Sequence, residues 1–509
     1  MGFFSSKPAH PLADSKELKR TLESLIGLDA ATALDETKAW LESLAHVDDM
    51  KVEQCLEILF RLDEAVQVQA MRLGRDYLTA PRQSRSEEYR LWNCNYSYWT
   101  QLAAAYEACL NRLASGEKPG KSLEALLPLF YVRLLRAYAT SIKWTQFRYA
   151  PMEAGFWLGA GRVYLAALAA RGERSPVLIY PNGRESTLER EYLQVLMLHS
   201  SSINGLMPLE VELAERLVAY LVPQLVFTNL VHPANVYWVD PAKDVPPTRL
   251  ARPPEITPTL RFLRPDAALE KIAEIRERIV RDGAIPPDLQ LGGQYPPETV
   301  LTVLDHLALN WQPKPPMRSH QRHMVKSRLS VIHGLATIHD RLAHGKNFFA
   351  DSPDEEAWIA EDVSMGGMGA QVPLGVNDWI AIGALIAIQP DGGDNWLVGM
   401  IRRFSRGDGR GSVGIQTIGK TPQAVVADGK GLHTALVLLD LPALPANDQA
   451  DSFMTEVITV DAVLDGSAFE AGVPLDVVLD GRSLRLRPQY IIESGTGFVI
   501  ARFQVELMS

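Results

Sequence analysis

The spacing of apolar residues changes once along the chain, at the proline-rich stretch of residues 311–316, and this change limits the fold more than any other feature. Before the stretch, apolar residues recur three and four positions apart, as do Leu18, Leu22 and Leu25, which is the period of an amphipathic helix. After it, apolar and polar residues alternate in short runs separated by turn residues, as in half-buried β-strands. The sequence therefore predicts a multidomain α+β protein that is mostly helical at its N-terminal end and β-rich at its C-terminal end.

Four segments follow from these patterns. Residues 1–223 are expected to form a helical domain, and residues 224–310 a mixed α/β connecting region in which short β-like runs precede a cluster of prolines and two further helices. Residues 311–427 contain six short alternating runs, which predict a six-stranded antiparallel β-barrel. Residues 428–509 are expected to form a further C-terminal β unit, because Asp480-Gly481 is typical of a tight hairpin turn.

Composition and charge exclude several classes of function. The formal net charge of −10 argues against a general nucleic-acid-binding protein, so any anion site has to be a local basic patch. The three cysteines, Cys55, Cys94 and Cys109, have neither metal-ligand spacing nor a disulfide framework, which fits a reducing cytoplasm. No apolar run is long enough to span a membrane. We therefore expect a cytoplasmic protein with no nucleic-acid partner and no membrane span.

A phosphate-binding-loop pattern, Gly-x-x-x-x-Gly-Lys-Thr, runs from Gly414 to Thr421. Such a loop binds phosphate because a strand leads into a helix whose N-terminus faces the anion. Here Pro422 and the β-branched residues after it predict an extended segment instead of a helix. We interpret Lys420 and its neighbours as a turn that leaves a barrel strand, and a nucleotide triphosphatase is the least favoured hypothesis.

Two polar segments are better candidates for a binding site. Residues 311–339 contain no carboxylate, although the protein as a whole is acidic, and they include Arg318, Arg322 and Arg328. Arginine is suited to anions because its planar fork of donors binds phosphate and guanine edges through two hydrogen bonds. The second segment, residues 360–373, places Asp362, Ser364 and several glycines between two predicted strands, where the backbone can approach a ligand closely.

Together these segments resemble the signature pair of the PilZ domain family: Arg318-x-x-x-Arg322, then a strand, then Asp362-x-Ser364-x-x-Gly367. The strand runs that follow, to about residue 425, are similar to the second half of that barrel. PilZ domains are six-stranded barrels that bind the bacterial second messenger cyclic di-GMP. The resemblance implies ligand contacts by Arg318, Arg322, Asp362, Ser364 and Gly367, with the arginines gripping the ligand and the strand-turn meeting a guanine.

One departure from the family concerns the gap between Arg322 and Asp362, which is longer than usual. The run of residues 328–338 is expected to be a strand, and residues 339–357 to extend the first hairpin. Arg328 then competes with Arg322 for the role of clamp. His333, His339 and His344 lie near one another, but no cysteine or acidic ligand converges with them, so no metal site is expected.

The leading hypothesis for function is a cyclic di-GMP receptor of bacterial origin, with no catalytic residues and no cofactor. Ligand binding to the barrel is expected to change its arrangement relative to the helical region, and so to change the interaction with a protein partner through that region. The alternative is a scaffold protein whose barrel is degenerate and binds no nucleotide. The third hypothesis is the triphosphatase that would use Lys420.

Overall fold

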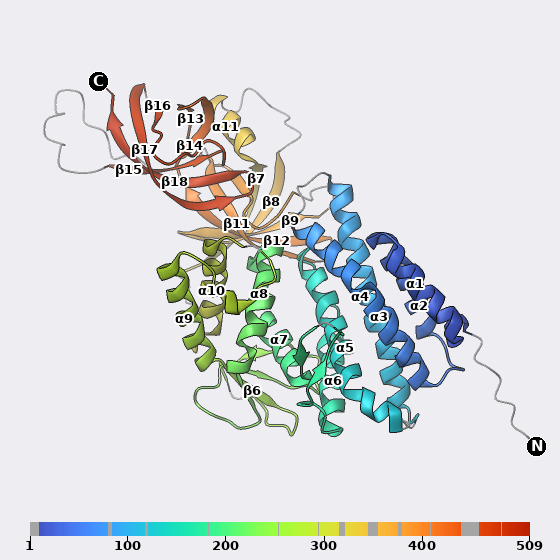
Figure 1. The fold of residues 1–509 in the computed structure, drawn as a ribbon. Coiled ribbons are helices and arrows are strands. Elements are labelled where there is room, and N and C mark those ends of the chain that lie inside the picture. The colour runs from blue at the N-terminus through green and yellow to red at the C-terminus, as the bar shows by residue number, and fades with distance from the viewer. Residues whose placement is uncertain are drawn as a thin grey trace, which may run out of the picture. The chain divides into compact units, whose positions relative to one another are not determined.

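The chain divides into two compact units, residues 1–203 with 208–316 and residues 204–207 with 317–509. This computed structural model describes residues 10–79, 84–117, 121–181, 183–252, 254–293, 295–314, 321–344, 355–374, 379–393, 395–407, 409–438, 458–479 and 481–508. The first unit is mostly helical and the second consists mainly of β-strands (Figure 1). The expected multidomain α+β fold, with a six-stranded antiparallel barrel and a further C-terminal β unit, is confirmed.

The helices of the first unit have the apolar faces that their sequences predict. Their bounds are α1 Ser15–Gly27, α2 Ala30–Ala45, α3 Val52–Thr79, α4 Arg85–Ala114, α5 Lys121–Gln146, α6 Phe156–Ala169, α7 Leu188–Ser200, α8 Pro208–Leu221, α9 Asp266–Asp282 and α10 Pro297–Trp311. Side-chain caps define several of their ends: Asp14 accepts hydrogen bonds from the first turn of α1, and Asp29 from that of α2. Gly283 ends α9 in the left-handed conformation.

Short strands complete the helical unit. They are β1 Val177–Leu178 and β2 Glu185–Ser186, which pair with each other, and β3 Val226–Thr228, β4 Tyr237–Val239, β5 Thr248–Arg249 and β6 Arg261–Arg264. The last four form a sheet in the order β3-β6-β4-β5. Single turns of 3₁₀-helix lie at Pro11–Ala13, Ile203–Gly205, Val222–Gln224 and Pro287–Leu289.

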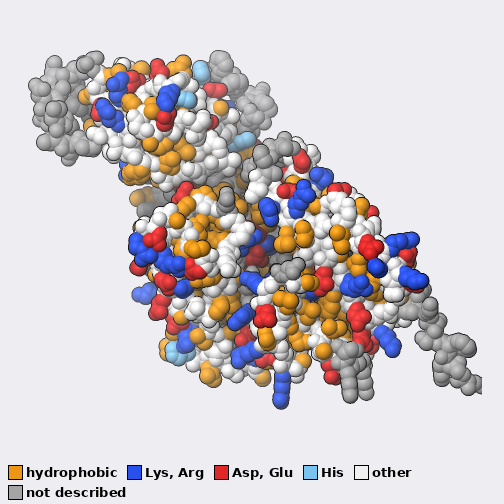
Figure 2. Space-filling view, viewed as in Figure 1, with side chains coloured by type: hydrophobic (Ala, Val, Ile, Leu, Met, Phe, Trp, Pro, Cys, Tyr) orange, Lys and Arg blue, Asp and Glu red, His pale blue; other side chains and the backbone are white. Residues whose placement is uncertain are grey.

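The surface of the helical unit mixes both signs of charge. On the face drawn in Figure 2, basic and acidic side chains are interspersed among the coloured residues of this unit. No helix in the described part of the chain is both long and apolar enough to cross a membrane.

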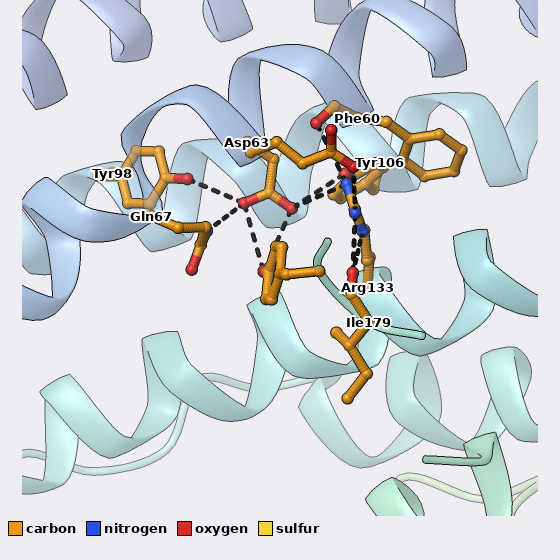
Figure 3. Close-up of polar contacts among 9 residues, drawn as sticks. Phe60, Asp63, Gln67, Tyr98, Tyr106, Arg133 and Ile179 are labelled. Carbon is orange, nitrogen blue, oxygen red and sulfur yellow. Dashed lines mark hydrogen bonds and ion pairs between the residues drawn. The ribbon is translucent and has the colours of Figure 1, made fainter. Parts of the chain in front are cut away.

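A buried carboxylate connects three of the long helices. Asp63 of α3 is fully buried, and Figure 3 shows its carboxylate facing side chains from neighbouring segments. The phenol of Tyr98 donates to Asp63 Oδ1 over 3.1 Å, and that of Tyr106 donates to Oδ2 over 3.3 Å; both tyrosines belong to α4. Tyr180, after β1, donates to the same carboxylate. Burial raises the pKa of Asp63, and the guanidinium of Arg133 opposes that rise.

Arg133 of α5 is the cation of this network and is itself buried. Its Nη1 lies 3.7 Å from Asp63 Oδ2, and its Nη2 lies 2.5 Å from Glu64 Oε1. The guanidinium also donates to the carbonyl oxygens of Phe60 and Ile179. One side chain therefore satisfies two backbone carbonyls and two carboxylates inside the helical unit, where an unpaired polar group is costly.

We expect Asp63→Ala to lower the free energy of unfolding of the helical unit by about 3–5 kcal/mol, because removal of one partner leaves a buried charge partly uncompensated. Asp63→Asn should cost less, since the amide oxygen still accepts hydrogen bonds from the phenols. Urea denaturation followed by far-ultraviolet circular dichroism, which reports mainly on helices, measures both. Glu64→Ala, at a carboxylate that is 34% exposed, is the control and should cost least. Equal effects of all three changes would contradict this account.

The second unit begins with the first barrel. Its strands are β7 His323–His333, β8 Glu356–Ser364, β9 Gly367–Pro373, β10 Leu385–Pro390, β11 Leu397–Arg406 and β12 Arg410–Gly419. They close in the order β10-β11-β12-β9-β8-β7, and each neighbouring pair is antiparallel.

The C-terminal β unit is a second closed barrel. Its strands are β13 Gln423–Asp428, β14 Leu432–Val437, β15 Thr459–Leu464, β16 Leu475–Leu479, β17 Arg482–Gly495 and β18 Phe498–Leu507, in the closed order β13-β14-β15-β18-β17-β16. When the strands of each barrel are counted from its first, both orders read first, second, third, sixth, fifth, fourth. The same connectivity therefore occurs twice in succession. The second barrel begins at Gln423, five residues before the expected boundary, because β13 pairs with β14 along its whole length.

A shared core joins the two barrels. Side chains on the outer faces of β10 and β11 pack against side chains of β14, β15 and β18; they include Leu385, Val398, Met400, Leu436, Val463 and Ile500. Arg402 of β11 forms a two-pronged ion pair with Glu493 of β17. Only residues 420–422 connect β12 to β13. These contacts indicate that the two barrels behave as one body.

The first hairpin is present, since β7 pairs with β8, but the strand expected over residues 328–338 ends early and a helix follows it. Residues 335–344 form a helix, α11 Leu335–His344, and β7 ends at His333. Gly334 has a φ of +83°, which turns the chain out of the strand. Leu335, Ile338 and Leu342 then recur three and four residues apart and pack into the shared core, so the helical period prevails over the strand expected there.

Candidate ligand site on the first barrel

The turn between β8 and β9 forms one side of the candidate site. Ser364 and Gly367 are directly paired across this turn, so only Met365 and Gly366 connect the two strands. The Ser364 hydroxyl donates to the carbonyl oxygen of Gly367 over 3.0 Å. This internal hydrogen bond holds the turn in a tight shape.

Gly367 is required by the packing of the barrel. A Cβ atom at this position would lie 2.0 Å from the carbonyl oxygen of Ile415 on β12, a distance that no real Cβ adopts. Gly367 pairs with Gln416, and the lack of a side chain lets β9 approach β12 closely. The glycine of the motif therefore has a structural role that is independent of any ligand.

An arginine–carboxylate pair joins the two halves of the motif. Arg322 Nη1 lies 2.6 Å from Asp362 Oδ1 and 2.8 Å from Oδ2. Asp362 Oδ1 also accepts a hydrogen bond of 3.0 Å from the backbone N–H of Gly369. The Arg322 side chain is 23% exposed and that of Asp362 is 22% exposed, so both remain accessible to a solute. Residues that are 40 positions apart in the sequence are in direct contact here.

Of the other two arginines, the structure describes Arg328 but not Arg318. Arg318 lies in residues 315–320, outside the described residues. Arg328 lies on β7 opposite Ile359, whereas Asp362 lies opposite Met324. At about 3.3 Å per residue, the position opposite Arg328 is roughly 10 Å along β8 from Asp362. Arg322, and not Arg328, is therefore the partner of the motif aspartate.

One exposed methionine lies beside the ion pair and another lies at the tip of the turn. The Met324 residue is 83% exposed and Met365, at the tip of the turn, is 69% exposed. Because Met324 pairs directly with Asp362, the two side chains project on the same face of the sheet. Polarizable thioethers beside a charged pair provide contact surface for a planar, partly apolar ligand.

The other sequence motifs do not form sites among the described residues. Strand β13 follows Gly419, Lys420 and Thr421 after a short turn, so no helix N-terminus is available there for a phosphate. His333 stacks on Trp379, while His339 Nε2 contacts the carbonyl oxygen of Val425. No group of three or more metal-ligating side chains occurs in the part of the chain that the structure describes.

Comparison with known families connects the helical unit to a receptor. Residues 16–233 match the family described as "Cyclic-di-GMP receptor FimW, N-terminal domain". The matched segment extends from α1 to the residues after β3, and it is similar to the N-terminal domain of a cyclic-di-GMP receptor. The search of curated proteins gave no match. The receptor family suspected from the barrel motifs is thus supported, but by the helical region instead of the barrel.

Sequence reasoning interpreted this helical region only as packed helices. The match extends over residues 16–233, a length that single-sequence patterns of three or four residues do not capture. The sequence contains one local signal. Asp63 follows Leu59 by four residues and precedes Val66 by three, so it lies on the same face of the helix as these two buried residues. An acid on an apolar face indicates a buried partner of opposite charge.

Gly367→Ala should disrupt the first barrel, because its Cβ would meet backbone that cannot move aside. We expect a loss of about 1–3 kcal/mol or more, with faster amide hydrogen exchange in β9 and β12. Ser364→Ala is the control on the other side of the turn and should cost about 1 kcal/mol, the contribution of one hydrogen bond. If Gly367→Ala leaves exchange in β12 unchanged, the close approach of the strands does not constrain this position.

Proposed function

We propose that the protein is a cyclic di-GMP receptor in which the first barrel, as a PilZ-like domain, binds the ligand. The match of the helical region to a cyclic-di-GMP receptor domain supports the ligand class. The contact between Arg322 and Asp362 is the observation that supports the location, because it joins the arginine segment and the strand-turn in one place.

Each half of the ion pair has a counterpart in the ligand. Phosphate oxygens, or the O6/N7 edge of guanine, compete with Asp362 for the Arg322 guanidinium. The N–H donors of guanine compete with Arg322 for the Asp362 carboxylate. Met324, which pairs with Asp362, supplies exposed surface beside the ion pair, and Met365 supplies more at the tip of the turn. Binding exchanges an internal ion pair for two charge-assisted contacts to one molecule, and Arg318 contributes a second cation from the preceding segment.

The proposed response is a change in the arrangement of the tandem barrels relative to the helical unit. Because the two barrels share a core and a two-pronged ion pair, they respond as one body. The ligand contacts the arginine segment that leads into β7, and only a ligand with different affinity for two arrangements can shift the balance between them. The helical unit then presents an altered surface to a protein partner.

The proposed location is the cytoplasm, and the proposed activity is binding without turnover. Cys55, Cys94 and Cys109 are buried free thiols, and Cys55 Sγ lies 3.7 Å from Cys109 Sγ. Unoxidised thiols at that separation fit a reducing compartment.

The competing function is that of a scaffold whose barrel binds no nucleotide. Equilibrium dialysis of the full chain against cyclic di-GMP and against ATP distinguishes the candidates. The receptor binds cyclic di-GMP alone, the scaffold binds neither ligand, and a triphosphatase binds and hydrolyses ATP. Absence of cyclic di-GMP binding to folded protein at micromolar concentrations would rule out the receptor.

Arg322→Ala should weaken cyclic di-GMP binding about ten- to a hundredfold, because a charge-assisted contact is worth about 1.5–3 kcal/mol. Arg318→Ala should have a similar effect. Arg328→Ala is the matched control, since Arg328 lies on β7, which follows Arg322, but away from Asp362. Isothermal titration calorimetry of the full chain measures all three. A larger effect from Arg328→Ala than from Arg322→Ala would show that the ligand-binding arginines are misassigned.

Lys420→Ala should leave cyclic di-GMP affinity within about twofold of the wild type, because Lys420 lies in the turn between the barrels and is followed by a strand. The same calorimetric titration tests this, together with an assay of phosphate release from ATP. A hydrolysis activity that disappears on this substitution would instead establish the triphosphatase.

A further inference from the structure

The helical unit has a pocket of its own, formed by residues that are not part of the barrel site. Helices α5, α6, α7 and α8 enclose about 650 Å³ of empty space, including the part that opens to solvent. Binding sites for small molecules often lie between the helices of a bundle. Residues with apolar side chains form more than half of the lining, and Phe156 and Trp157 at the start of α6 provide its aromatic surface.

The charged groups of this pocket are neutralised internally. Arg136 Nη1 lies 2.8 Å from Glu191 Oε2. Lys143 Nζ lies 2.6 Å from Glu215 Oε2 and 2.7 Å from Glu212 Oε2. Burial alone would raise the pKa of Glu212, but the cations of Lys143 and Arg216 lower it to about 2, so this cluster stays ionised at neutral pH. An anionic ligand would meet Glu191 and Glu215, and a cationic ligand would meet Arg136 and Lys143.

Three uncharged polar side chains remain to bind a ligand. Thr140, Gln194 and His199 line the pocket, and none of their side chains forms a hydrogen bond to another described residue. The imidazole of His199 packs edge-on against Trp157, with ring centroids 4.8 Å apart. Burial lowers the pKa of His199 to about 4, so at neutral pH it offers one donor and one acceptor without charge.

We propose that this pocket binds a small uncharged molecule of one or two rings that carries an amide-like edge of hydrogen-bond donors and acceptors. The apolar lining with Phe156 and Trp157 accommodates the ring. Gln194, His199 and Thr140 pair with the polar edge, which compensates for the loss of water from these groups. We do not assign cyclic di-GMP to this pocket, because the cations that would hold its phosphates are already paired with carboxylates. The proposal is therefore independent of the receptor function of the barrel.

Saturation-transfer NMR on the full chain tests this pocket with nicotinamide, uracil and quinolin-2-one as neutral probes. At least one probe should bind at about millimolar concentration or tighter. Nicotinate, which has the same ring as nicotinamide but carries a carboxylate, should bind at least tenfold more weakly than nicotinamide. Saturating cyclic di-GMP should displace none of the bound probes.

Two substitutions assign the signal to the pocket. Gln194→Leu keeps the size of the side chain, removes its amide and should weaken probe binding at least tenfold. Gln224→Leu makes the same chemical change at an exposed position outside the pocket and should have no effect. Ala139→Phe should fill the pocket and abolish probe binding. If the Ala139→Phe variant does not fold, Gln194→Leu still tests the proposal. Absence of binding by all three probes, equal binding of nicotinate, displacement by cyclic di-GMP, or an unchanged affinity in Gln194→Leu would each overturn the proposal.

Discussion

The ion pair of Asp63 and Arg133 is the interaction on which the helical unit depends. Arg133 donates to the backbone carbonyl oxygens of Phe60 in α3 and Ile179 after β1. Asp63 accepts from phenols on another helix and on the segment after β1. In a medium of low dielectric constant such a network is stable only when every member has its partner. It therefore fixes the relative positions of α3, α4 and α5 more specifically than apolar packing alone.

The tandem barrels depend on a different constraint, which is the burial of strands on both faces. In β10 the residues Leu385 and Ala387 face the second barrel, while Ile386 and Ile388 lie on the opposite side. A strand covered on both faces has a continuous apolar sequence instead of an alternating one. The shared core thus couples the first barrel to the second, and the proposed ligand at Arg322 would act on the pair.

Much of the architecture was predictable because period and turn residues are local properties. The helical region, the six strands of the first barrel and the hairpin before Arg482 follow from them. The helix after Gly334 was missed, since its few apolar residues also fit a short strand. That the C-terminal unit is a closed barrel was not foreseen, because closure depends on the pairing of β13 with β16, which no local pattern encodes. At the candidate site, Arg322 and Asp362, both named by the motif, are in contact. The structural role of Gly367 was not predictable from the motif, because it depends on Ile415, a residue outside it.

The shared core also has a consequence for how the chain is synthesised. The ribosome releases the first barrel before β14, β15 and β18, which cover its outer face. At about 5–20 residues per second, Leu385, Val398 and Met400 remain uncovered for several seconds after β12 has emerged. During that interval the nascent chain exposes an apolar face of the sheet, which can associate with other chains. Chaperone binding to the growing polypeptide would matter most at this stage. A chain terminated after the first barrel would keep this apolar surface exposed.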